Sequence, residues 1–261
     1  IELPNYPPME IGAAQQIGDY LFVGVKSGAT TNNSNRFLIN SGFEIYDISI
    51  WDRPIRLSQT ETLKPVTGLE IVGGTAYLAA SEEGLIVIDI NDYEAPLLLS
   101  KHPAAGNSVI DISINPVSNV LAQAVVDDAQ NTGYVSFIDI TRDVLSSPQG
   151  YQTIFLNEMS ESDTRLNGQP VDVQWFNNKL YLMYERDSAL YLATFTGFGD
   201  TVSRAVQKIE RGFAKSISLD QYSFLVSEGQ ISVSAEGEYL VLEGGIDTGF
   251  DTIYWESHTP R

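Results

Sequence analysis

Two aspartates occupy the same place in two copies of a short apolar pattern. Asp111 lies in the run Val-Ile-Asp-Ile, and Asp172 lies in the run Pro-Val-Asp-Val. Two carboxylates at one cavity can bind Ca²⁺ through their oxygen atoms, or can act as acid and base on a sugar. They can also accept hydrogen bonds from neighbouring backbone, as buried polar groups generally do. We expect this structural role, with cation binding and catalysis as the alternatives.

Acidic residues also gather in two segments that have the composition of loops. Asp127 and Asp128 begin the run Asp-Asp-Ala-Gln-Asn, and Asp247 and Asp251 lie in a glycine-containing run. Neither segment has the twelve-residue ligand spacing of an EF-hand, and acidic turns are common in an acidic chain. We therefore predict no cofactor, with Ca²⁺ at these four aspartates as the alternative.

The remaining residues exclude several kinds of active site. The chain has no Cys and only two histidines, His102 and His258, so a zinc site built from His and Cys is excluded. It contains neither the Gly-x-Ser-x-Gly turn of a serine hydrolase nor the Gly-x-Gly-x-x-Gly loop of a dinucleotide site. We therefore favour a non-enzymatic role and keep an enzymatic role as an alternative.

An internal repeat supplies the elements that would carry these residues. Residues 42–48, 84–90 and 133–140 each contain a Gly, an apolar run and an Asp, and each is followed by a Pro. Trp51 and Tyr93 follow the first two copies at matching positions, which predicts a packing role shared between repeats. A repeat of roughly 40–50 residues built from short β-branched runs is typical of a β-propeller, in which each copy forms a four-stranded blade.

Two shorter apolar runs precede each repeated segment, joined by a polar turn such as Gly-Asp or Asn-Asn, as in a β-hairpin. We therefore predict an all-β chain that forms one propeller domain over residues 1–261. Six blades are the alternative to five, because residues 231–241 can also be read as the start of another blade. The five predicted four-stranded blades cover residues 11–60, 67–101, 108–156, 169–209 and 213–256.

The first strands of a propeller line its central channel, and both Asp111 and Asp172 fall on predicted first strands. At the corresponding position we assign Ala13, Gly68 and Lys215 to the other first strands. The sequence therefore predicts no complete ring of acidic side chains in the channel. It allows an ion pair between Lys215 and one of the aspartates.

The repeated segments resemble a known family of repeats. The run Gly-Leu-Ile-Val-Ile-Asp-Ile of residues 84–90, and its copy at residues 42–48, resemble the LVIVD-type repeat of bacterial and archaeal surface and secreted β-propellers. That repeat runs Gly-Leu-x-Val-hydrophobic-Asp-Val-Ser/Asn, with a Pro several residues later. The resemblance implies an extracellular, cell-surface or periplasmic protein whose role is binding. It carries no shared catalytic motif.

The charge of the chain excludes other classes of partner. The chain has 34 Asp and Glu residues against 15 Lys and Arg, which gives a net charge of −19. Such a chain repels the phosphate backbone of nucleic acids. No apolar run approaches the roughly 20 residues of a membrane-spanning helix. We therefore predict no nucleic-acid partner and no membrane insertion, and we expect the chain to be a module of a larger protein or a cleaved exported protein.

Long connections are predicted to collect on one face of the propeller. They are residues 26–41, 102–108, 127–132 and 157–169, which join second to third strands or one blade to the next. Long connections carry a disproportionate share of binding sites. The candidate binding residues in them are Asn32, Asn33, Arg36, His102, Asn107, Asp127, Asp128, Asn131, Asp163 and Arg165.

These observations predict a non-enzymatic, exported or cell-surface β-propeller that binds a protein or a glycan through its long-loop face. One alternative is a carbohydrate-active hydrolase or lyase that uses Asp111 and Asp172 as channel carboxylates. A second alternative is a structural or assembly component, since unpaired edge strands can pair with another chain.

Overall fold

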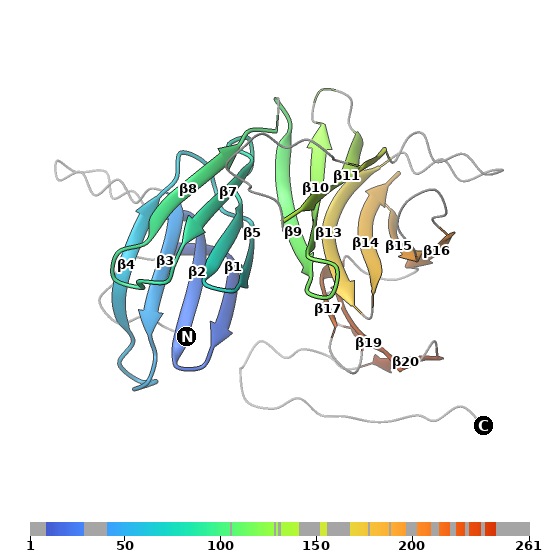
Figure 1. The fold of residues 1–261 in the computed structure, drawn as a ribbon. Coiled ribbons are helices and arrows are strands. Elements are labelled where there is room, and N and C mark those ends of the chain that lie inside the picture. Colours follow the sequence, from blue (N-terminus) through green and yellow to red (C-terminus); the bar gives the residue numbers. More distant parts are fainter. Residues whose placement is uncertain are drawn as a thin grey trace, which may run out of the picture.

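The computed structural model describes most of the chain. The described residues are 9–28, 41–104, 106–127, 129, 132–140, 152–155, 168–176, 178–187, 189–196, 203–209, 214–219, 223–227, 230–235 and 238–243. Side chains from residue 203 onward lie outside this description. All regular structure in these residues is β-strand, and the strands form five four-stranded antiparallel sheets (Figure 1).

The sheets follow one another along the chain. Sheet 1 contains β1 (Met9–Ile17), β2 (Tyr20–Gly28), β3 (Gly42–Asp47) and β4 (Ile55–Glu61). Sheet 2 contains β5 (Gly68–Val72), β6 (Thr75–Ala79), β7 (Leu85–Asp89) and β8 (Leu97–His102). Sheet 3 contains β9 (Ser108–Asn115), β10 (Val120–Asp127), β11 (Thr132–Asp139) and β12 (Gln152–Phe155). Sheet 4 contains β13 (Gln169–Phe176), β14 (Lys179–Arg186), β15 (Ala189–Thr196) and β16 (Ser203–Ile209). Sheet 5 contains β17 (Ala214–Leu219), β18 (Ser223–Ser227), β19 (Gln230–Ala235) and β20 (Glu238–Glu243).

The turns within the sheets follow from local chemistry. The hairpin between β1 and β2 turns at Gly18, whose φ of 59° lies in the left-handed region that glycine adopts without strain. After the third strands of sheets 1 and 2 the repeated Asp closes a turn. The Asp47 carboxylate accepts a hydrogen bond from the Ser49 N–H at 2.8 Å, and Asp89 accepts one from the Asn91 N–H at 2.9 Å. The bonds to Ser49 lower the pKa of Asp47.

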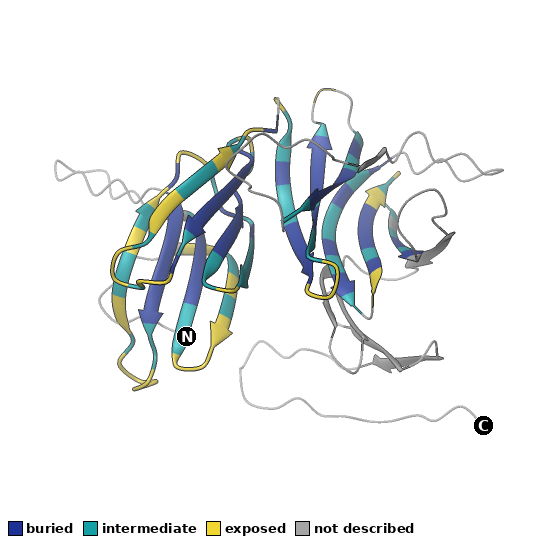
Figure 2. Cartoon of the chain, viewed as in Figure 1, coloured by how far each residue is buried: buried dark blue, intermediate teal, exposed yellow. Residues whose placement is uncertain are grey.

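The sheets pack face to face, with their first strands side by side. The first strands β1, β5, β9, β13 and β17, which we call the inner strands, contact one another in this order. Separate apolar clusters fill the spaces between sheets 1 and 2, between sheets 2 and 3, and between sheets 3 and 4. The middle strands of the sheets are accordingly the most buried parts of the described chain (Figure 2).

Strand β7 shows why the repeated segments read as continuous apolar runs. Leu85 and Val87 face the cluster shared with sheet 3, whereas Ile86 and Ile88 face the cluster shared with sheet 1. Successive side chains of a strand point to opposite faces, so a strand between two neighbouring sheets needs apolar residues at every position. The same rule places Trp175, which is 7% exposed, between sheets 3 and 4.

The all-β propeller fold predicted from the sequence is confirmed. Strands β19 and β20 continue the sheet of β17 and β18, so residues 230–243 supply third and fourth strands rather than a new first hairpin. The number of blades in the complete ring and the single-domain organisation stay predictions. Within the described part of the chain, no helix has the length and apolarity needed to span a membrane.

One predicted packing role is half wrong. Tyr93 packs its ring against Tyr20 and Phe22 of the preceding sheet, with ring centroids 4.5 and 5.5 Å apart. Trp51, at the matching position of sheet 1, is 79% exposed.

Candidate functional site

Four of the five inner strands share a β-bulge that sets their register. The pairing with the second strand shifts between Ile11 and Ala13 in β1, and the equivalent shifts occur in β9, β13 and β17. A bulge adds one residue to one strand and re-aims the side chains around it. By this register Ser216, and not Lys215, corresponds to Asp111 and Asp172. Assigning Lys215 to that position was wrong, because Lys215 is itself the extra residue of the bulge.

Asp111 takes part in the contact between sheets 3 and 4. Its Oδ2 accepts a hydrogen bond from the backbone N–H of Val173 on β13 at 2.9 Å. Burial raises the pKa of Asp111 well above its usual range, the charge of Asp172 and the hydrogen bond between the two carboxyls raise it further, and the N–H groups of Val173 and Ile112 lower it in part. The two neighbouring carboxyls therefore hold a proton more readily than two isolated carboxyls would.

This geometry does not suit either kind of glycosidase. Two carboxyls joined by a hydrogen bond are closer than the separation of about 5–5.5 Å in retaining enzymes or about 6.5–9.5 Å in inverting enzymes. Asp111 and Asp172 instead join neighbouring sheets, which is the structural role that the sequence predicts. Across the described residues, no group of three or more His, Cys, Asp or Glu side chains is arranged to hold a metal ion.

A second level of polar side chains on the inner strands was missed by the sequence analysis. Gln15 of β1 accepts a hydrogen bond through Oε1 from the Ile71 N–H of β5 at 2.9 Å. Ser113 of β9 accepts one through Oγ from the Trp175 N–H of β13 at 2.9 Å. An inner strand pairs with its own sheet along one edge only, so the N–H groups of the other edge need acceptors from the neighbouring sheet.

Glu70 of β5 occupies the equivalent position between sheets 2 and 3. Its carboxyl faces the backbone N–H of Ile114 and the hydroxyl of Ser113, both on β9. Burial raises the pKa of Glu70 to about 7, against the opposing effect of these two donors. Glu70 therefore exchanges its proton near neutral pH while it joins two sheets.

Two glycines of the inner strands lie so close to the neighbouring sheet or its entering connection that a side chain would not fit. A Cβ added to Gly12 of β1 would lie 2.0 Å from the carbonyl oxygen of Val66. A Cβ added to Gly68 of β5 would lie 2.6 Å from Oδ1 of Asp111 and 3.0 Å from its Cα. These contacts explain why no aspartate stands at the Gly68 position, since a side chain there would occupy the space of the Asp111 carboxyl.

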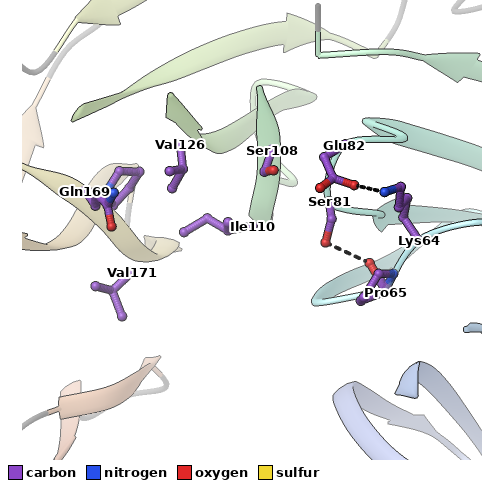
Figure 3. Close-up of a pocket in the computed structure, with 10 residues that line it drawn as sticks. Lys64, Pro65, Ser81, Glu82, Ser108, Ile110, Val126, Gln169 and Val171 are labelled. Carbon is purple, nitrogen blue, oxygen red and sulfur yellow. Dashed lines mark hydrogen bonds and ion pairs between the residues drawn. The ribbon is translucent and has the colours of Figure 1, made fainter. Parts of the chain in front are cut away.

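A hollow of about 590 Å³ opens where the inner strands begin (Figure 3). It is formed by the connection from β4 to β5, the connection from β6 to β7, the starts of β9 and β13, and the end of β10. All of these segments lie on the face that carries the connections between sheets and between second and third strands, which we call the loop face. The lining residues are Lys64, Pro65, Ser81, Glu82, Ser108, Ile110, Val126, Gln169, Pro170 and Val171.

The bulges explain how apolar side chains reach this hollow. Ile110 and Val171 are the extra residues of the bulges in β9 and β13, and each precedes one of the channel aspartates. Both line the hollow (Figure 3). The Asp111 carboxyl that follows Ile110 instead bonds to the neighbouring sheet. The rim is polar, since Lys64 forms an ion pair with Glu82, and the Ser81 hydroxyl donates to the Pro65 carbonyl at 3.1 Å.

The predicted binding residues that the structure describes lie near this hollow without lining it. His102 Nε2 lies 3.0 Å from the Ser100 hydroxyl, and the Asn107 side chain donates to the Tyr134 hydroxyl at 3.3 Å. Asp127 accepts a hydrogen bond from the Ala129 N–H at 3.1 Å. The other predicted binding and metal-binding residues lie outside the described residues: Asn32, Asn33, Arg36, Asp128, Asn131, Asp163, Arg165, Asp247 and Asp251.

Comparison with solved structures gives similarity in fold. Hydrazine synthase of Kuenenia stuttgartiensis has a TM-score of 0.60 and 13% identity, over 83% of this chain and 61% of that chain. Sqt1 of Saccharomyces cerevisiae has a TM-score of 0.60 and 12% identity, over 90% and 62%. A protein from Lactobacillus plantarum has a TM-score of 0.61 and 13% identity, over 90% and 69%. This chain therefore spans less than two thirds of the length of the first two structures.

Sequence comparison adds no relative. No family model matches the chain, and no curated protein matches it. The LVIVD-type resemblance therefore stays a prediction. At 12–13% identity the structural similarity carries the fold alone. The chain is a β-propeller-type protein.

Proposed function

We propose that this chain is a non-enzymatic β-propeller module, exported or displayed at the cell surface, that binds a protein or a glycan on its loop face. The observation that supports the proposal is the hollow at the start of the inner strands. Its volume of about 590 Å³ falls within the range of about 300–1,000 Å³ that is usual for binding pockets. Its lining is apolar at Ile110, Val126 and Val171 and polar at the rim, which is a common arrangement in binding sites.

The inner strands support binding rather than catalysis. Asp111 and Asp172 are engaged with each other and with the backbone of β13, and Glu70 is engaged with β9. Asp111 and Asp172 directly follow Ile110 and Val171, so these bonds fix the strand ends that line the hollow. Lining residues that are fixed in this way lose little conformational entropy when a ligand binds, which favours affinity.

The test is a binding screen of the purified chain against a glycan array and a displayed peptide library. The site variant is Val171→Asp, which places a charge on the lining of the hollow. The control is Leu97→Asp, because Leu97 is also apolar and is 63% exposed on β8. We expect one class of ligand to bind the unmodified chain and the control, and to bind the site variant about tenfold more weakly or worse.

Two results would count against the proposal. Equal binding by Val171→Asp and Leu97→Asp would place the binding site elsewhere. Turnover of a glycan or an ester that survives purification would show that the chain is an enzyme. The location is tested separately by fractionating cells that produce the complete natural protein, for which we expect recovery from the envelope or the medium.

A further inference from the structure

The lining of the hollow discriminates between the two classes of ligand in the proposed function. Half of the ten lining residues that the structure describes are aliphatic or proline, and none of these ten is aromatic. The uncharged polar side chains among the ten are Ser81, Ser108 and Gln169, and the Ser81 hydroxyl already donates to Pro65. A glycan carries many hydroxyl groups, and each one buried without a partner costs free energy. An aliphatic side chain makes no such demand and gains from burial.

The charges around the hollow favour a cationic partner. Four basic side chains are described on the loop face, and each is paired with an acid of this chain. The Nζ atom of Lys26 lies 3.8 Å from Oε1 of Glu10, and the Nε atom of Arg186 lies 3.3 Å from Oδ2 of Asp187. The other two pairs are Lys64 with Glu82 and Lys101 with Glu83.

Further acids on the same face have no basic partner among the described residues. Glu61 at the end of β4 and Glu185 near the end of β14 are both exposed. The described part of the loop face therefore has an excess of negative charge, in keeping with the net charge of −19 for the whole chain. Such a surface attracts cationic partners and repels anionic ones.

We infer that the hollow binds a cationic protein segment, which inserts an aliphatic side chain against Ile110, Val126 and Val171 and sets lysines or arginines against the surrounding acids. This inference rests on the proposed function and narrows it from protein or glycan to basic protein. The aliphatic side chain supplies affinity through burial. The flanking cations supply the rate of association and the selection between partners.

The peptide arm of the screen tests the composition of the segment. The probe is a library of random displayed dodecapeptides, selected on the immobilised chain at low salt. We expect the recovered peptides to carry Leu, Ile, Val or Met flanked by Lys or Arg. One recovered peptide is then synthesised, and its Kd is measured by calorimetry for the unmodified chain and for each variant.

Charge-reversal variants test the acids without disturbing the hollow. In the double variant Glu61→Lys with Glu185→Lys, we expect binding of the peptide to weaken about two- to fivefold for each substitution, and the loss to shrink at high salt. The matched control is Asp52→Lys with Glu94→Lys, which makes the same charge change at exposed residues on the opposite face. The control variant should bind within about twofold of the unmodified chain, because its charges lie beyond the screening length.

Each outcome bears on the inference separately from the proposed function. Recovery of acidic or uncharged peptides would overturn the inference, and so would equal loss of binding in the two charge variants. Glycan binding that is lost in Val171→Asp, with no peptide recovered, would overturn the inference and leave the proposed function standing. No ligand of either class would overturn both. All charge-reversed residues are exposed, so the test does not depend on a variant with an altered interior.

Discussion

Different side chains accept a backbone hydrogen bond at two neighbouring junctions, the one between sheets 1 and 2 and the one between sheets 2 and 3. At the first, the Gln15 amide accepts a hydrogen bond from the Ile71 N–H at 2.9 Å. At the second, the Glu70 carboxyl stands in the equivalent position and faces the Ile114 N–H. An amide is neutral at every pH, whereas a carboxyl is neutral only when it holds a proton. The fold therefore requires a hydrogen-bond acceptor at this position of the inner strand. Glu70 meets this requirement and in addition carries a charge that depends on pH.

The largest effect is expected where the two junctions are tightest. In Gly12→Ala the new Cβ would meet the Val66 carbonyl oxygen at 2.0 Å, and the Val66 backbone is held to β2 by the hydrogen bond from its N–H to the Val25 carbonyl. In Gly68→Ala the nearest atom is Oδ1 of Asp111, which can rotate, although the Asp111 Cα at 3.0 Å cannot. Overpacking of this kind costs about 1–3 kcal/mol and occasionally more. We expect a loss of about 3 kcal/mol or more for Gly12→Ala and about 2 kcal/mol for Gly68→Ala.

Urea unfolding at constant pH measures both losses. The matched control is Ala14→Val, which enlarges an exposed residue of β1 and should change the free energy of unfolding by less than about 0.5 kcal/mol. Equal stability of Gly12→Ala and the control would show that β1 and the connection from β4 to β5 do not approach as closely as described.

The next effect concerns the pH dependence of the Glu70 junction. The pKa of Glu70 is about 7 in the folded protein, above the usual value of 4.5 expected in the unfolded chain. Between these values the folded protein binds more protons, so its free energy of unfolding falls as the pH rises through about 7. A difference of this size corresponds to slightly more than about 3 kcal/mol in full. In Glu70→Gln, which keeps an acceptor, this part of the pH dependence should disappear.

The measurement is the free energy of unfolding of both proteins between pH 5 and pH 8. The difference between the two proteins separates the contribution of Glu70 from the contributions of two other groups. One is Tyr77 of β6, which lies opposite Glu70 in the pairing of β5 with β6, and the other is the Asp111–Asp172 pair. The aspartate pair acts in the same direction, since its pKa is also raised, and it remains in both proteins. A constant difference across this range would mean that Glu70 is ionised in the folded protein throughout.

The sequence predicts the fold well because the fold depends on residue patterns that recur from one blade to the next. The continuous apolar run of β7 is needed on both faces, and Asp89 is needed to close the turn after it. Any copy of the blade has the same backbone requirements, so the residues that meet them repeat along the chain. Trp51 marks the limit of this reasoning, because it stands at the same position of the repeat as Tyr93 and is nevertheless 79% exposed.

The site was predicted less well, because its residues do not repeat in kind. Three different side chains, those of Gln15, Glu70 and Ser113, each face a backbone N–H of the next inner strand. No repeated residue type therefore marks their position in the sequence. Ile110 and Val171 look like ordinary strand residues, and only the bulge places them on the hollow. The binding residues in the long loops were predicted from polarity and loop length. These two criteria do not detect an apolar lining that is built from strand ends.

The smallest effect is expected from the reverse exchange, in which Gln15→Glu gives the first junction the chemistry of the second. The new carboxyl keeps an acceptor for the Ile71 N–H, so the fold should be retained. Gln15 is partly buried, and burial raises the pKa of a carboxyl, so the variant should become less stable as the pH rises above about 5. We expect a difference of about 1 kcal/mol between pH 5 and pH 8 relative to the unmodified chain. Glu70→Gln and Gln15→Glu should then have pH profiles of opposite slope when each is compared with the unmodified chain. Parallel profiles would show that the two junctions differ in more than the side chain that joins them.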